Sequence, residues 1–194
     1  MFVAAVHLCL NPPVERMKKF SLPLMFLALL VFIAGCSTAP PDGVKSVSPF
    51  DVNRYLGQWY EIARLDHSFE RGLSEVSATY TLQADGSLEV LNKGYDAKRD
   101  KWKSATGRAL FTGPQTQGSL KVSFFGPFYG GYHVIALDQA DYQWAMISGP
   151  DRDYLWILAR SKSLAPSLRE ALVKQAAELG FATQKLIWVD HRQP

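Results

Sequence analysis

The sequence predicts an all-β protein with one C-terminal helix, whose strands close into an eight-stranded antiparallel up-and-down β-barrel. Short runs of aromatic and branched residues follow one another from residue 57 onwards, and turn residues such as Gly, Pro and Asp separate them. Most of these runs can be joined as hairpins, and closing eight strands on themselves removes both exposed sheet edges. One amphipathic stretch near residue 170 supplies the helix. Strand spacing alone also leaves an open β-sandwich as an alternative.

The first predicted strand covers residues 56–64 and contains Gly57 and Trp59. A buried indole removes about 150–250 Å² from water, and its N–H then needs a partner. The glycine can adopt backbone angles closed to other residues, which lets the chain turn tightly beneath that ring. We therefore expect Trp59 to lie in the core at the start of the sheet.

Seven further strands are predicted after a polar loop over residues 65–74. They are residues 76–82, 88–95, 102–111, 120–125, 132–137, 142–147 and 154–159. The last of them is apolar at every position, so one of its faces can look into the barrel while the other carries a helix.

The predicted helix follows this last strand. Pro166 suits its first turn and Gly180 its end. The apolar residues recurring at helical spacing are Leu168, Leu172, Ala176 and Leu179. A short closing strand is predicted over residues 186–189.

Residues 1–35 are predicted to be a secretory signal peptide. Lys18 and Lys19 precede an apolar run over residues 20–34, which is shorter than the roughly 20 residues that span a bilayer. Because Met17 stands directly before these lysines, we expect translation to start there rather than at Met1. Residues 33–36 resemble the bacterial lipoprotein box, in which the thiol of the cysteine, here Cys36, is acylated and becomes the membrane anchor.

Residues 36–48 are predicted to form the lipidated N-terminus and a flexible tether, because small, polar and Pro residues dominate them. Residues 49–194 are then the barrel domain. In the lipoproteins that this sequence resembles, a serine directly after the anchor, here Ser37, favours the outer membrane, with the barrel facing the periplasm.

The charge distribution argues against a nucleic-acid partner. Of the net charge of +3, Arg16, Lys18 and Lys19 against Glu15 place +2 in the first 35 residues, which leaves +1 for the rest. A body this close to neutral has no basic surface for phosphate.

The pattern of Gly57, Trp59, a strand run ending at Arg160, one helix and a strand resembles the lipocalin family. Residues 57–64, 124–132 and 149–158 resemble its bacterial outer-membrane branch in particular. The resemblance implies that Arg160 lies across Trp59 at the closed end of the barrel as a structural pair, a contact of about 0.5–2 kcal/mol. It also implies a cup that binds and stores or transports fatty acids, phospholipids and lysophospholipids.

For the lining of this cup, the sequence suggests Tyr132 and Trp156, with Trp144 and Tyr154 behind them. The alternative for each ring is packing in the core or against the helix. A second aromatic group, formed by Phe124, Phe125, Phe128 and Tyr129, surrounds Gly126-Pro127 in a predicted loop. Such an apolar patch is a candidate contact for a membrane, a ligand or the second subunit of a homodimer.

No catalytic, metal or cofactor site is predicted. His67, His133 and His191 are scattered, and no zinc-binding histidine pair or Gly-x-Ser-x-Gly elbow is present. Because a triad assembled in space leaves no local motif, a lipid-modifying hydrolase or isomerase stays open as the alternative. A purely structural envelope lipoprotein is the third possibility.

Overall fold

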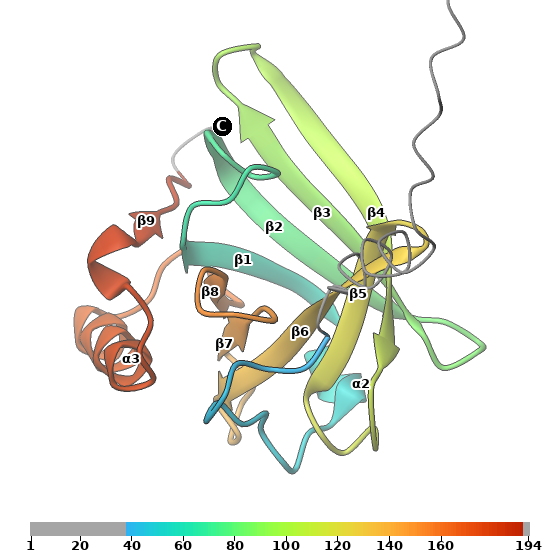
Figure 1. The fold of residues 1–194 in the computed structure, drawn as a ribbon. Helices are drawn as coiled ribbons and strands as arrows, with labels where there is room; N and C mark the ends of the chain where they lie inside the picture. Colours follow the sequence, from blue (N-terminus) through green and yellow to red (C-terminus); the bar gives the residue numbers. More distant parts are fainter. Residues whose placement is uncertain (1–37, 192–194) are drawn as a thin grey trace, which may run out of the picture. The chain divides into compact units, whose positions relative to one another are not determined.

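The computed structural model describes residues 38–191, so the predicted signal peptide and Cys36 lie outside the described residues. All the described residues belong to one compact unit. In chain order its elements are α2 (Val52–Tyr55), β1 (Gly57–Arg64), β2 (Leu73–Leu82), β3 (Leu88–Asp96), β4 (Lys101–Phe111), β5 (Ser119–Phe125), β6 (Phe128–Leu137), β7 (Trp144–Ser148), β8 (Leu155–Ala159), α3 (Pro166–Glu178), the 3₁₀ turn η1 (Thr183–Lys185) and β9 (Ile187–Trp188) (Figure 1).

Strands β1 to β8 form a closed antiparallel barrel. Each strand pairs with the next in the chain, and β1 pairs with both β2 and β8. Tyr60 shows the closure directly, because it pairs with Ser77 on one side and with Ala159 on the other. The predicted up-and-down barrel is confirmed and the open sandwich is wrong. The short β9 adds to the far end of β1, opposite Ala63 and Arg64.

Three strands begin two or more residues away from their predicted start. Strand β2 begins at Leu73, inside the predicted loop, and β6 begins at Phe128, directly after the Gly126-Pro127 turn. Strand β7 begins later than expected, since Tyr142 has φ 55° and closes a turn by donating its N–H to the carbonyl of Asp138 at 2.9 Å.

The short helix α2 was missed by the sequence analysis. Asp51 caps it, because the carboxylate accepts a hydrogen bond from the backbone N–H of Asn53 at 2.9 Å. An aspartate at this position is an ordinary helix-start signal. It was overlooked because the helix has only four residues.

Two apolar cores flank the barrel wall. The inner core fills the closed end of the barrel around Trp59, and the second lies between the outer wall and α3. Strand β8 serves both, as predicted: Leu158 belongs to the inner core, whereas Leu155 and Ile157 face the helix side. The helix contributes its expected apolar stripe, with Leu172 and Ala176 buried.

Part of the predicted flexible tether, within the residues that the structure describes, packs against the barrel. Val44 is buried in the second core. The N–H of Val47 donates to the carbonyl of Val134 at 2.8 Å, and the carbonyl of Val47 accepts from Gly118 at 3.0 Å. The two valines give this otherwise polar segment apolar surface to bury, and its backbone groups find partners on the barrel.

At the closed end, the guanidinium carbon of Arg160 lies 3.9 Å from the ring centroid of Trp59. The indole N–H donates to the carbonyl of Tyr55 at 2.8 Å, and Arg160 donates to the carbonyls of Gln58 and Arg54 at 2.8 and 2.7 Å. Gly57, with φ 87°, turns the chain from α2 into β1 close to this guanidinium. Arg160 thus fastens α2 and β1 beneath the indole.

Within residues 38–191, no helix is both long and apolar enough to cross a membrane.

Candidate ligand-binding site

A cavity of about 610 Å³ opens inside the barrel above the inner core. This volume lies within the range of about 300–1,000 Å³ that is usual for small-molecule sites. Strands β1, β2, β3, β5, β6 and β8 supply most of its wall, and the β1–β2 and β7–β8 loops complete the mouth. The aromatic lining residues are Phe69, Tyr80, Phe124, Phe128, Tyr129, Tyr132, Tyr154 and Trp156.

Three of the four predicted cup residues lie in this lining: Tyr132, Tyr154 and Trp156. Trp144 does not, because it packs against the second core. The alternation of β7 explains the error. Ala145 and Ile147 point into the inner core, so Trp144 points outward to the helix side.

Three tyrosine hydroxyls meet at the floor of the cavity, where Tyr80 and Tyr132 line it and Tyr55 lies behind them. The hydroxyl of Tyr132 is 2.7 Å from that of Tyr55 and 2.7 Å from that of Tyr80. Burial raises the pKa of all three phenols, so each stays neutral and hydrogen-bonded at physiological pH. The floor therefore offers an approaching alkyl chain neither a charge nor an unsatisfied polar group.

A polar network that the sequence analysis did not predict lies at the mouth. Arg64 donates to Oε1 of Glu61 at 2.5 Å and to the carbonyl of Glu70 at 2.9 Å. Oε2 of Glu70 accepts the indole N–H of Trp156 at 3.2 Å and lies 3.0 Å from Nε2 of His67. Glu61, Arg64, His67 and Glu70 are all buried, although the β1–β2 loop was expected to be a polar surface loop. Glu61 could have been predicted, because it is two residues from Trp59 and so shares its inward face.

The pKa values of the two carboxyl groups in this network are shifted in opposite directions. Burial raises the pKa of Glu61 well above its ordinary value, and the charge of Glu70 raises it further, which outweighs Arg64. Burial also acts to raise the pKa of Glu70, but its hydrogen bond and charge interaction with His67, and the N–H of Trp156, lower it on balance. Glu61 therefore takes up a proton more readily than Glu70.

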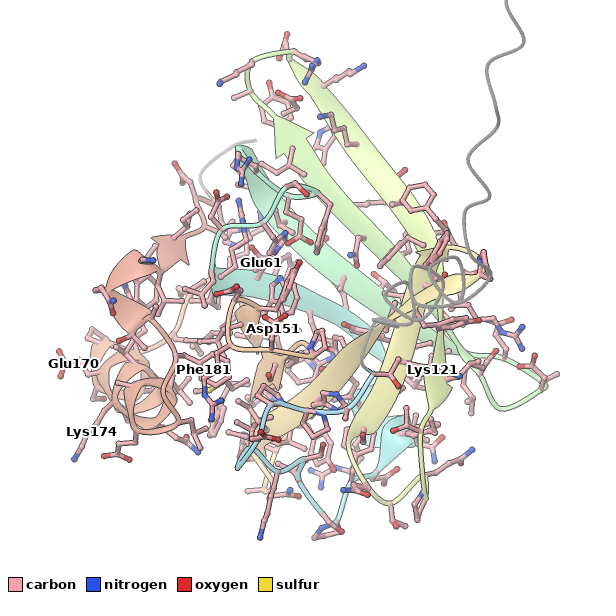
Figure 2. All side chains as sticks on the ribbon, viewed as in Figure 1. Glu61, Lys121, Asp151, Glu170, Lys174 and Phe181 are labelled. Carbon is pink, nitrogen blue, oxygen red and sulfur yellow. The ribbon has the colours of Figure 1, made fainter. Side chains whose placement is uncertain are left out.

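The cavity lining is acidic. Of the lining residues, Glu61, Glu70 and Asp151 carry carboxyl groups, and none is Lys or Arg. Figure 2 labels Glu61 and Asp151. Arg64 is absent from the lining, since it is 1% exposed behind Glu61. The mouth thus combines apolar and aromatic surface with carboxyl groups.

A profile of the lipocalin-like domain matches residues 50–191. The chain belongs to the lipocalin family. Outer membrane lipoprotein Blc of Escherichia coli strain K12 is 53% identical over 170 residues, which cover 87% of this chain and 96% of the relative. Outer membrane lipoprotein Blc of Vibrio cholerae is 48% identical over 169 residues, covering 87% and 98%. The predicted bacterial lipocalin lipoprotein, lipid-anchored at the outer membrane, is confirmed by these relatives.

The fold agrees with solved lipocalin structures. Insecticyanin from the tobacco hornworm Manduca sexta superposes with a TM-score of 0.62 at 25% sequence identity, covering 80% of this chain and 87% of that one. This chain therefore shares its overall fold with a solved structure.

The second aromatic group lies on the hairpin of β5 and β6 rather than in a long loop. Phe125 and Phe128 pair with each other at the strand ends and are 81% and 71% exposed. Phe124, Phe128 and Tyr129 also line the cavity, whereas Phe125 does not. The exposed apolar patch predicted here consists of Phe125 and Phe128 alone.

The other histidines are dispersed over this lipocalin. His133 is buried, with Nδ1 3.0 Å from the hydroxyl of Ser119. Nε2 of His191 lies 2.7 Å from the carbonyl of Glu61. Among residues 38–191, no group of three His, Cys, Asp or Glu side chains is placed to hold a metal ion.

Proposed function

We propose that this lipocalin binds one single-chain lipid, a lysophospholipid or a fatty acid, and stores or transports it at the periplasmic face of the outer membrane. The observation that carries the proposal is the apolar cavity of about 610 Å³, which ends on the neutral tyrosine floor and opens at a polar mouth. The alkyl chain would lie along the barrel and the head group would stay at the mouth.

The energetics favour such a ligand. Burying about 15 methylenes at ~0.8 kcal/mol each gives roughly 12 kcal/mol before costs. Association then costs about 4–15 kcal/mol, which leaves a modest net affinity. Because one methylene changes the affinity little, chain burial distinguishes lipids poorly. Selection among lipids therefore falls to the mouth.

Titration of the tryptophan fluorescence of residues 37–194 with a lysophospholipid and a fatty acid tests this function. We expect saturable quenching by the lipid in the wild type and its loss in Trp156→Ala, because Trp156 lines the cavity. Trp144→Ala is the matched control and should keep the quenching, since that indole packs outside the barrel. If Trp156→Ala and Trp144→Ala are quenched equally, the ligand does not bind in the cavity beside Trp156.

The recovered lipid decides between a carrier and an enzyme. We propose that the protein acts without chemical turnover, so mass spectrometry should recover the lipid intact after prolonged incubation. Cleaved or isomerised lipid would instead support the lipid-modifying enzyme. Absence of any binding would leave a structural envelope protein.

We further propose that the acyl anchor is attached to Cys36, after removal of residues 1–35. Two or more acyl chains are needed for durable membrane attachment, and lipidation of the cysteine would supply them. Cys36→Ala should therefore move the protein from the outer-membrane fraction to the soluble periplasmic fraction. If the variant stays with the outer membrane, Cys36 is not the anchor.

A homodimer built on the exposed pair of Phe125 and Phe128 stays a prediction of the sequence. Their exposure supports it, because two neighbouring apolar rings facing water are a favourable contact for a second copy.

A further inference from the structure

We propose that the tip of the β3–β4 hairpin, residues 93–103, is a docking surface for an anionic phospholipid bilayer. Its basic side chains would bind lipid phosphates, and Trp102 would lie at the level of the head groups. The tip comprises the end of β3, the turn over residues 97–100 and the start of β4. This inference concerns a surface outside the cavity and does not depend on the lipid proposed to bind there.

Positive charge is concentrated at the hairpin tip. It carries five basic residues against two acidic ones, so its net charge is +3. The basic residues are Lys93, Lys98, Arg99, Lys101 and Lys103. Residues 36–194 together carry only +1, which leaves −2 for the rest of the barrel domain. The near-neutral total therefore conceals a local basic surface, which the total charge of the domain did not lead us to expect.

Three of the five cations at the tip are free to meet an external anion. Lys93, Lys98 and Lys101 are exposed and have no carboxylate partner among residues 38–191. The other two basic side chains pair with a single carboxylate, that of Asp96, at 2.8 and 2.7 Å. The acidic residues of the tip thus leave a surplus of positive charge.

The tip extends beyond the neighbouring strand, which leaves both of its faces accessible. Strand β4 pairs with β5 only from Arg108 to Phe111, so residues 101–107 are paired with β3 alone. Residues 101–106 are all exposed. Figure 1 shows β3 and β4 projecting past the end of β5. Pairing between β3 and β4 runs without a bulge, so a regular ladder holds the charges in place.

Trp102 adds an aromatic ring to this basic tip. It is 54% exposed, and its ring centroid lies 5.7 Å from that of Tyr95 on the paired strand. Tryptophan and tyrosine are enriched at the boundary between membrane and water, because their rings are apolar in one part and polar in another. An exposed indole beside lysines fits a bilayer surface better than it fits a free anion or an acidic peptide.

An anionic bilayer is the partner that this combination favours. Lysine side chains can place their ammonium groups among lipid phosphates while their methylenes stay at the apolar boundary. Each basic residue near an anionic leaflet raises the affinity about fivefold. Because this lipocalin is an outer-membrane lipoprotein, phospholipid head groups are an anionic surface within its reach.

Cosedimentation with vesicles tests the inference. Residues 37–194 suit the experiment, because the described residues form one compact unit and the acyl anchor is absent. Equal amounts of phosphatidylglycerol and phosphatidylcholine should bind the protein at least tenfold more tightly than phosphatidylcholine alone in about 0.1 M salt. The difference should disappear in about 1 M salt, where charges are screened within about 3 Å. Equal binding to both kinds of vesicle would overturn the proposal.

The double substitution Lys98→Gln with Lys101→Gln tests whether the tip makes the contact. We expect it to weaken binding to the anionic vesicles about 25-fold. The matched control is Lys174→Gln with Lys185→Gln, which removes the same charge from exposed positions on α3 and η1 and should change little (Figure 2 labels Lys174). Trp156→Ala alters the cavity and should keep vesicle binding. Equal losses in the two double variants would show that the tip is not the contact.

The last measurements test the ring and the nature of the partner. Lipids brominated near the head group should quench tryptophan fluorescence, and Trp102→Phe should lose most of that quenching. Unchanged quenching in this variant would overturn the position proposed for the indole. Competition by inorganic phosphate or polyglutamate at constant ionic strength would show that the tip binds anions without a bilayer, and would overturn the bilayer as its partner.

Discussion

Replacement of Trp59 by alanine is expected to lower the free energy of unfolding by about 3–5 kcal/mol. The indole is fully buried, contacts Tyr55 at a centroid distance of 4.8 Å and lies under Arg160. Its removal leaves a cavity in the inner core and takes away the ring beneath the guanidinium that holds α2 and β1. Urea unfolding followed by circular dichroism measures the loss.

Trp102→Ala is the matched control for this prediction. That indole is 54% exposed on β4, so its removal should change the free energy of unfolding by less than about 0.5 kcal/mol, as surface substitutions usually do. Similar losses in both variants would mean that Trp59 has no special place in the fold.

Replacement of Arg64 by methionine is expected to cost about 3–5 kcal/mol of stability at neutral pH, as does breaking other buried ion pairs. The buried carboxyl groups of Glu61 and Glu70 would lose the guanidinium beside them, and the carbonyls of Glu70 and Leu73 would lose a donor. The β1–β2 loop would therefore loosen at the mouth. Chemical unfolding and a lipid titration should both report the change.

The loss of stability caused by replacing Arg64 should be larger at high pH than at low pH. Burial already raises the pKa of Glu61, and removal of Arg64 leaves its ionised form still less favourable. As the pH falls, the carboxyl pair takes up protons and its buried negative charge decreases. The difference in stability between the variant and the wild type should therefore shrink from pH 8 to pH 5. A difference that is constant or grows over this range contradicts the explanation.

Arg71→Met provides the comparison on the same loop. Arg71 pairs with Asp66 at 2.8 Å, but the two side chains are 63% and 42% exposed. Such surface pairs contribute about 0–1 kcal/mol, because water screens them. A small loss that varies little with pH is expected here.

The residues suggested for the cup show which part of the site could be predicted from sequence patterns. Tyr132 and Trp156, which the sequence suggested for the cup, line the cavity, as aromatic residues in barrel strands often do. Trp144 was predicted wrongly because a strand pattern shows that neighbours alternate but does not show which set points inward. A shift of one residue reverses the assignment, and the register of β7 with β6 and β8 decides it.

The polar network at the mouth could not be predicted from the sequence, for a different reason. His67 and Glu70 belong to a loop of polar and charged residues, which suggests a solvated surface. They are buried because Arg64 and Trp156, from two strands far apart in the sequence, donate to Glu70. No local pattern records such a meeting.

By itself, the sequence determined the barrel, the helix on its outer wall and the burial of Trp59, because strand alternation, turn residues and helical spacing are local properties of the chain. The place of Arg160 across Trp59 followed instead from the resemblance to the lipocalin family. The tertiary structure alone decided which aromatic rings face the cavity and that the mouth is acidic. Those features depend on strand register and on contacts between distant residues, where burial and hydrogen bonding overrule the polarity of the local sequence.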